Sequence, residues 1–215
     1  MNRYQLKMAG FENVLSGMEI RTIVITPSKA IRADNDLITD ALGGNLAAFK
    51  ELVERYYKPA YCYARGMTHN SDDAYDLSQE AFVRVHKHLR RFDPKYPFKV
   101  WLFHILANLC KNHLRQKRTR DKVFVTSEEA STYDAVETVE PDAGLYQSEI
   151  QKQVWNAIVE LPEKFKEVII LSHFQDMSYD QIAQALEIPR GSVMSRLYYA
   201  RLKLREILEK RGVEL

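Results

Sequence analysis

The sequence predicts an all-α protein in which two small helical domains are joined by a flexible acidic linker. Glycine and proline are scarce, with eight and seven among 215 residues, which favours helices over a turn-rich β fold. Apolar side chains recur at three- and four-residue spacing through most of the chain. This periodicity stops in the predicted linker, residues 121–144, where acidic and hydroxyl side chains are frequent.

The composition argues against a membrane or secreted protein. No apolar run approaches the roughly 18 residues that a membrane span requires, and no secretion signal opens the chain. The two cysteines, Cys62 and Cys110, are far apart and lie in helical patterns, as expected of a reduced protein. We therefore expect a cytoplasmic protein with no direct membrane insertion.

The net charge of +2 conceals an uneven distribution of charge. Residues 111–122 carry six Lys or Arg against one acid, and residues 190–211 carry seven against two. Between them, residues 121–149 hold eight acids and one base. Two basic patches separated by an acidic tether suit a protein that grips a polyanion at two places. Basic runs also occur on ordinary solvated helix faces, so charge alone leaves both interpretations open.

Helical patterning begins after an N-terminal extension. Residues 1–33 show no sustained period and are predicted to be poorly ordered. Asp34 or Asn35 is suited to cap the helix that follows, and Gly43-Gly44-Asn45 marks its end. The next apolar stripe leads to Pro59, which predicts that another helix starts near it.

Two longer helices complete the first domain, residues 34–120. Ser71 or Asp72 is suited to cap the earlier one, whose inner face is predicted to contain Ala74, Leu77, Ala81, Val85 and Leu89. Two prolines within four residues then require a loop over residues 93–97. The later helix runs from about 98 to 119, and its apolar side chains are Trp101, Leu102, Ile105, Leu106, Leu109 and Leu114.

The second domain, residues 145–215, contains the strongest chemical signal, a helix-turn-helix. Ser178 and Gln181 form a capping box, so a helix is expected to start at Tyr179, and Pro189 is suited to start the next one. The inward side chains of the first helix are predicted to be Ile182, Ala183 and Leu186. Those of the second are predicted to be Val193, Leu197, Ala200 and Leu204.

The outward side chains of the second helix suit a recognition helix. They are Arg190, Ser192, Met194, Ser195, Arg196, Tyr198 and Tyr199. Residues near the N-terminus of a recognition helix reach base edges, while arginines also hold phosphates. An ordinary helical hairpin would share the capping box, but the short turn, the small residue at the crossing and the basic outer face together favour DNA binding.

Three motifs in this order resemble the sigma-70 family of RNA polymerase sigma factors, in particular its extracytoplasmic-function (ECF) subgroup. Residues 76–85, DLSQEAFVRV, resemble the signature of the second conserved region, and residues 98–115 resemble the promoter-melting helix after it. Residues 161–171 and the helix-turn-helix resemble the fourth region. The resemblance implies a factor that binds core RNA polymerase, melts promoter DNA and directs transcription initiation.

The resemblance also implies partners and roles for particular residues. The positions that dock on the clamp of the largest polymerase subunit correspond to Asp76, Gln79, Glu80 and Val83. The positions that read and hold the minus-ten element correspond to Phe92, Lys95, Tyr96, Phe98, Trp101, Asn108, Lys111, Arg115, Lys117, Arg118 and Arg120. The outward residues of the recognition helix would face the minus-thirty-five element. The flap of the second-largest subunit and a dedicated anti-sigma factor are further expected partners.

Some of these residues have a simpler interpretation. Acids on one helix face can be merely solvated, and a Trp in an apolar stripe, such as Trp101, is as often part of a core. Met194 and Tyr199 depart from the arginines that the family often places there, so the preferred promoter sequence cannot be transferred from relatives.

Two other functions are less consistent with the sequence. A helix-turn-helix regulator of the response type normally carries an α/β receiver domain, and no strand alternation appears upstream. A recombinase needs a serine nucleophile or an acidic metal site on a sheet, and no such constellation is visible. Histidines and cysteines lack metal-ligand spacing. We therefore expect no catalytic residues, metal or cofactor.

Overall fold

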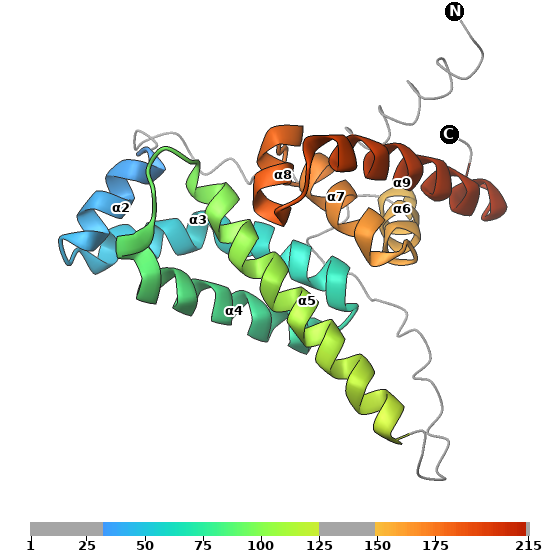
Figure 1. Ribbon diagram of the computed structural model, residues 1–215, viewed down its shortest axis with the longest axis horizontal. Helices are drawn as coiled ribbons and strands as arrows, with labels where there is room; N and C mark the ends of the chain where they lie inside the picture. Colours follow the sequence, from blue (N-terminus) through green and yellow to red (C-terminus); the bar gives the residue numbers. More distant parts are fainter. Residues whose placement is uncertain (1–31, 125–148, 214–215) are drawn as a thin grey trace, which may run out of the picture.

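The computed structural model describes residues 32–124 and 149–213, and within these ranges every regular element is a helix. Figure 1 shows two groups of helices, α2–α5 and α6–α9, side by side. The predicted all-α fold with two helical domains is thereby confirmed. The N-terminal extension and most of the predicted linker lie outside the described residues, so the domain boundaries stay predictions. No described helix is both long and apolar enough to span a membrane.

The first domain is a bundle around one apolar core. Its elements are α2 (Asp34–Leu42), α3 (Leu46–Thr68), α4 (Ser71–His88), the short 3-10 helix η1 (Leu89–Arg91) and α5 (Phe98–Phe124). The five predicted inner residues are all buried: four of them lie on α4, which packs against α3 and α5, and Leu89 begins η1. Among the largest buried side chains here are Leu37, Leu52, Tyr63, Met67, Phe98, Leu102, Phe103 and Leu106.

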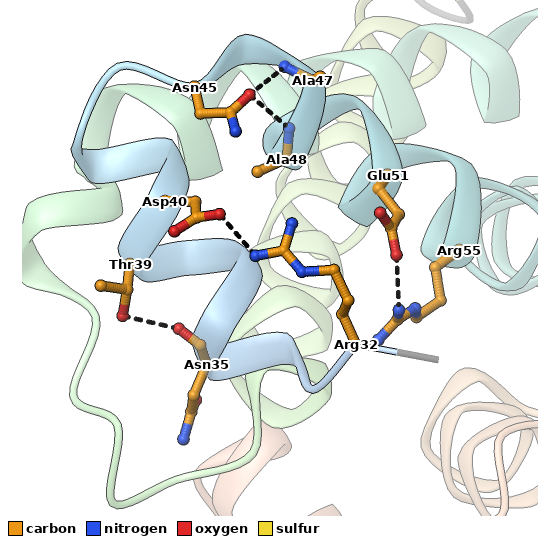
Figure 2. A network of polar contacts seen from close by, with 9 residues as sticks. All are labelled: Arg32, Asn35, Thr39, Asp40, Asn45, Ala47, Ala48, Glu51 and Arg55. Atoms are coloured by element: carbon orange, nitrogen blue, oxygen red, sulfur yellow. Dashed lines mark hydrogen bonds and ion pairs between the residues drawn. The ribbon is translucent and has the colours of Figure 1, made fainter. Parts of the chain in front are cut away.

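Polar contacts fix the start of the bundle, partly in a different way from the prediction. The cap of α2 is Ala33, which has no capping side chain, while Asp34 lies in the first turn and binds Arg55 and Tyr56, each at 2.5 Å. Asn45 caps α3 by accepting hydrogen bonds from two backbone amides (Figure 2). Arg32 also binds Asp40 at 2.5 Å, which ties the residues before α2 to its last turns.

Pro59 does not start a helix, contrary to the prediction, because α3 runs through it without a break. An interior proline costs about 3 kcal/mol in an isolated helix, but tertiary packing can outweigh that cost. Here α3 packs against α2, α4 and α5 along its length. The cap of α4 is likewise Asn70, one residue before the predicted Ser71 or Asp72, and its side chain accepts from the amide of Asp73 at 2.8 Å.

The second domain contains α6 (Glu149–Val159), α7 (Glu163–His173), α8 (Tyr179–Leu186) and α9 (Arg190–Lys210). The capping box of Ser178 and Gln181 is present, and α9 starts directly after Pro189 as predicted. The four predicted inner residues of α9 are buried. Ala183 is only half-buried, and the buried alanine of α8 is Ala185.

The two domains pack against each other mainly through two pairs of helices, with a smaller contact between α3 and α6. Helix α7 lies on α3, and α8 lies on α5 (Figure 1). Polar contacts cross the boundary as well: Gln175 Nε2 donates to the Pro59 carbonyl at 3.3 Å, and Lys99 donates to the Gln175 carbonyl. This arrangement places the basic helix α5 directly beside the helix-turn-helix.

Candidate polymerase and nucleic-acid interfaces

The outer face of α4 combines acidic, amide and apolar groups. Asp76, Gln79, Glu80 and Val83 are all exposed, as an interaction surface requires. Val83 is 49% exposed, and sequence reasoning missed Tyr75 on the same helix, which is 53% exposed. Large apolar side chains that remain exposed together are typical of a surface that a partner covers. The helical positions of Tyr75 and Val83, beside predicted docking residues, were the available signal.

Three aromatic side chains gather where the loop before α5 meets the start of that helix. Phe92 lies 5.4 Å from Trp101 and 6.0 Å from Phe98, measured between ring centroids. Phe98 is 1% exposed, so in this structure it cannot contact nucleic acid, contrary to its predicted role as a minus-ten reader. Its ring packs against Trp101 in an edge-to-face contact, with 6.1 Å between the ring centroids, and Trp101 itself is half-buried.

A cavity of about 590 Å³ opens beside this cluster, between α5 and α8. Phe92, Tyr96 and Trp101 line it on one side, and Gln184 and Ile188 line it on the other. Aromatic rings next to polar edges can stack and hydrogen-bond an unpaired base. In this structure, however, the second domain supplies one wall of the cavity.

Polar groups continue from the cavity along α5. Asn108 is exposed and its amide nitrogen lies 3.3 Å from His104 Nε2, while His104 Nδ1 lies 3.3 Å from the Ala185 carbonyl. Four of the predicted minus-ten cations on this loop and helix are exposed to solvent and make no ion pair with the described residues of the second domain: Lys95, Arg115, Lys117 and Arg120. They leave a basic face available to phosphates.

Two of the predicted phosphate-binding cations are paired with the second domain. Lys111 Nζ lies 3.2 Å from Glu167 Oε2, and Arg118 donates to Glu163. Glu167 also accepts from Arg196 at 2.7 Å, so one buried carboxylate joins the two basic helices. Burial raises the pKa of Glu167 above its ordinary value, although Lys111 and Arg196 act in the opposite direction.

Sequence reasoning missed Glu167 altogether. Its only signal was an acid in the middle of the apolar run from Phe165 to Leu171, at a position that faces the interior. Buried carboxylates require partners, so such an acid predicts a cation nearby but does not say which one.

The N-terminal half of α9 presents an outer face that is only partly basic. Met194, Tyr198 and Tyr199 are each more than half exposed, at 52%, 54% and 54%, and the two tyrosine rings lie 5.3 Å apart. Arg190 Nε lies 3.3 Å from Asp180 Oδ1, in an exposed pair that DNA could replace. The outer face of α9 is thus more aromatic than its composition alone indicates.

Three further positions on α9 differ in how freely they can reach DNA. Arg196 points back to buried Glu167, which contradicts its predicted free position on the outer face. Ser195 is exposed and its hydroxyl donates to the Ser192 carbonyl, whereas Ser192 is half-buried.

The cysteines are not placed for chemistry. Cys62 and Cys110 are both buried and unbridged. Burial raises the pKa of the Cys110 thiol to about 12, which keeps it protonated and unreactive. Among the residues that the structure describes, no group of three or more His, Cys, Asp or Glu side chains is arranged to hold a metal ion.

Comparison with known proteins identifies both domains. The family models for Sigma-70 region 2 and Sigma-70, region 4 match residues 52–120 and 151–204. The RNA polymerase sigma-H factor of Pseudomonas aeruginosa is 31% identical over 182 residues, which cover 82% of this chain and 94% of that protein. The ECF RNA polymerase sigma-E factor of Escherichia coli (strain K12) is 32% identical over 174 residues, covering 78% and 90%.

Solved structures agree with this assignment. CnrH, solved in complex with the cytosolic domain of CnrY, superposes with a TM-score of 0.60 at 26% identity, covering 83% of this chain and 99% of that one. The sigma factor RpoE from Bartonella quintana, solved with the anti-sigma factor NepR, has the same fold, with a TM-score of 0.57 at 24% identity, covering 75% and 96%. The chain therefore belongs to the extracytoplasmic-function group of the sigma-70 family of RNA polymerase sigma factors.

Proposed function

We propose that this chain binds core RNA polymerase, recognises and melts specific promoters, and so directs transcription initiation. The observation that carries this proposal is that one chain combines an exposed docking face on α4 with two separate basic helices, α5 and α9. A regulator that only binds DNA would need neither the α4 face nor the aromatic cavity. The polymerase supplies the chemistry of RNA synthesis, and we assign no catalytic step to this chain.

Two surfaces divide the recognition of the promoter. The minus-ten surface consists of Phe92, Tyr96, Trp101 and Asn108 with the basic residues of α5, and it would stack an unpaired base and hold the adjacent phosphates. The minus-thirty-five surface consists of Arg190, Met194, Ser195, Tyr198 and Tyr199 on α9, and it would read the major groove of duplex DNA. Unpairing bases costs free energy, and contacts of the minus-ten surface with the unpaired base can offset that cost.

A second proposed partner is an anti-sigma factor, which would hold the chain inactive until it is needed. The support is family membership together with CnrH, which was solved in complex with another protein's cytosolic domain. We propose that both the chain and its polymerase act in the cytoplasm.

Reconstitution with core polymerase tests the main proposal. Run-off transcription from genomic fragments should yield new start sites only when this chain is added. Replacing Gln79 and Glu80 together by alanine should weaken co-elution with core polymerase, because both side chains lie on the exposed docking face. Glu54→Ala, which removes another exposed acid, on α3, is the control and should leave co-elution unchanged.

Two outcomes would contradict the proposal. Addition of the chain to core polymerase without any new transcript would exclude the sigma function. Co-elution that survives the double replacement would remove the α4 face from the interface, even if transcription still depends on the chain.

A further inference from the structure

The centre of the outer face of α9 carries no charge. Met194 and Tyr198 lie one helical turn apart, and so do Ser195 and Tyr199, so these four side chains form one continuous patch. All four are exposed, and the three large ones are each more than half exposed. Large apolar side chains grouped on a surface are typical of a binding site. The ligand of this patch should therefore offer apolar as well as polar groups.

The two arginines that flank the patch are directed at other groups. Arg196 donates to the buried carboxylate of Glu167 at 2.7 Å, behind the outer face. Arg190 Nε lies 3.3 Å from Asp180 Oδ1 in the first turn of α8. The first helix of a helix-turn-helix crosses the DNA backbone, so this position of Arg190 suits a phosphate contact. The patch itself thus lacks a guanidinium group for the bidentate readout of guanine.

The polar atoms of the patch discriminate weakly between base edges. The Ser195 hydroxyl already donates to the Ser192 carbonyl at 3.1 Å. The hydroxyls of Tyr198 and Tyr199 can each donate or accept, so they tolerate either kind of polar group on a base. What the patch offers instead is a thioether chain and two aromatic rings. In the major groove, the apolar group that distinguishes one base from the others is the C5-methyl of thymine.

We infer that the minus-thirty-five surface recognises thymine methyl groups, so that its preferred element contains A·T pairs whose thymines contact Met194 and Tyr199. DNA is the ligand that the surrounding charge favours, since residues 190–211 carry seven Lys or Arg against two acids. The inference rests on the proposed function and deepens it, because it names the base chemistry that one of the two promoter-binding surfaces reads.

The test uses holoenzyme reconstituted from core polymerase and the full chain. Selection from promoters randomised over the minus-thirty-five element first identifies the bound sequence. Each thymine of that element is then replaced, one position at a time, by deoxyuridine, which keeps base pairing and lacks only the methyl group. Competition with the unmodified duplex measures the change in affinity. Removing a contacted methyl group should weaken binding about fourfold, the loss expected when one such group is no longer buried.

Variants assign each methyl contact to a side chain. In Met194→Ala or Tyr199→Ala, the thymine and deoxyuridine duplexes should bind equally at the position that the missing side chain contacts. Both residues are exposed, so their replacement should leave the fold intact. Met194→Leu keeps an apolar side chain and should retain the fourfold difference. Lys203→Ala, which removes an exposed cation of α9, should weaken both duplexes alike and also retain the difference.

A reverse change tests the same inference by a gain of specificity. Met194→Arg adds the guanidinium group that the patch lacks. Because arginine binds O6 and N7 of guanine in a bidentate manner, guanine should replace thymine at one position of the selected element. Selection of the same thymine by the wild type and by Met194→Arg would contradict a base contact by residue 194.

Three outcomes separate the inference from the proposed function. A selected element without thymine, or equal binding of every deoxyuridine duplex by the wild type, would overturn the inference, while transcription from the selected promoters would still support the proposed function. Weaker co-elution of Met194→Ala and Tyr199→Ala with core polymerase, with unchanged selected sequences, would assign the patch to a protein partner instead. A holoenzyme that starts no transcript would contradict the proposed function, and the inference with it.

Discussion

Helices α5 and α9 are both basic and both proposed to bind DNA, yet they meet the rest of the chain differently. On α5, Lys111 and Arg118 are paired with carboxylates of the other domain. On α9, the corresponding inward pair is made within its own domain, between Arg196 and Glu167, and the outer face remains open. The difference shows that contacts between the domains involve basic residues of α5, whereas the outer face of α9 stays exposed to solvent.

The largest expected effect is a loss of stability on replacing Phe98, which distinguishes it from Trp101, the other aromatic residue near the start of α5. Phe98→Ala should lower the free energy of unfolding by about 3–5 kcal/mol, because it leaves a cavity in a fully buried site. Denaturant unfolding monitored by circular dichroism measures this. A loss of promoter opening without any loss of stability would instead support the predicted role of Phe98 in contacting DNA.

Replacing Trp101 should impair promoter opening more than it lowers stability. Trp101→Ala is expected to weaken open-complex formation by about 1–3 kcal/mol, the value of stacking one base on an aromatic ring. Permanganate footprinting of unpaired thymines with reconstituted polymerase provides the measurement. Trp101→Phe, which keeps a stacking surface, is the control and should retain most of the opening; equal loss in both variants would argue against stacking.

Changes on the open surface should be smaller and should affect sequence preference. Tyr199→Ala is expected to alter binding to the preferred upstream element by about 1 kcal/mol, the lower end for one base-pair contact. Selection of minus-thirty-five sequences from a randomised promoter pool would measure it. Lys203→Ala, further along α9 and also exposed, should leave the selected sequences as in the wild type.

The last prediction concerns the pH dependence of the contact between the two domains. Burial, and then the charge of Lys166, lower the pKa of His69 from 6.5 to about 4, and Arg65 and Lys117 add to this. The contact between the domains therefore prefers neutral His69, so the contribution of this group to the contact is complete above pH 6.5 and weakens as pH falls from 6.5 toward 4. Between pH 7.5 and 5.5 we expect the contact between the two domains to lose about 1 kcal/mol of stability, which small-angle X-ray scattering would detect as a rising radius of gyration.

A variant at the same position separates this titration from general acid effects. His69 adopts a left-handed backbone with φ of 61°, a conformation that asparagine tolerates. His69→Asn should therefore flatten the pH dependence while preserving the end of α3. A wild-type radius of gyration that stays constant over this pH range would show that His69 does not contribute to the contact between the domains.

Local sequence rules were sufficient where local forces decide the structure. The capping box at Ser178, the break at Pro162 and the inner faces of α4 and α9 all follow from spacing and side-chain chemistry. Pro59 shows the limit, since contacts of α3 with helices of both domains override the preference of one residue.

The domain contact was beyond such rules, because its members are far apart in the chain. Nothing near Gly66 indicates that Ile170 will lie against it, and nothing near Lys111 indicates Glu167. The burial of Phe98 was not predicted for a related reason, because it depends on packing against Tyr56 and Phe92 in the folded domain.

The two buried cysteines have a practical consequence for following domain movement in solution. Maleimide dyes react with thiolates, and a thiol with a pKa of about 12, such as that of Cys110, is almost never a thiolate at neutral pH. Cys62 is shielded by burial as well. New cysteines placed on exposed positions of α4 and α9 should therefore take up a donor and an acceptor dye selectively, without first removing the native thiols.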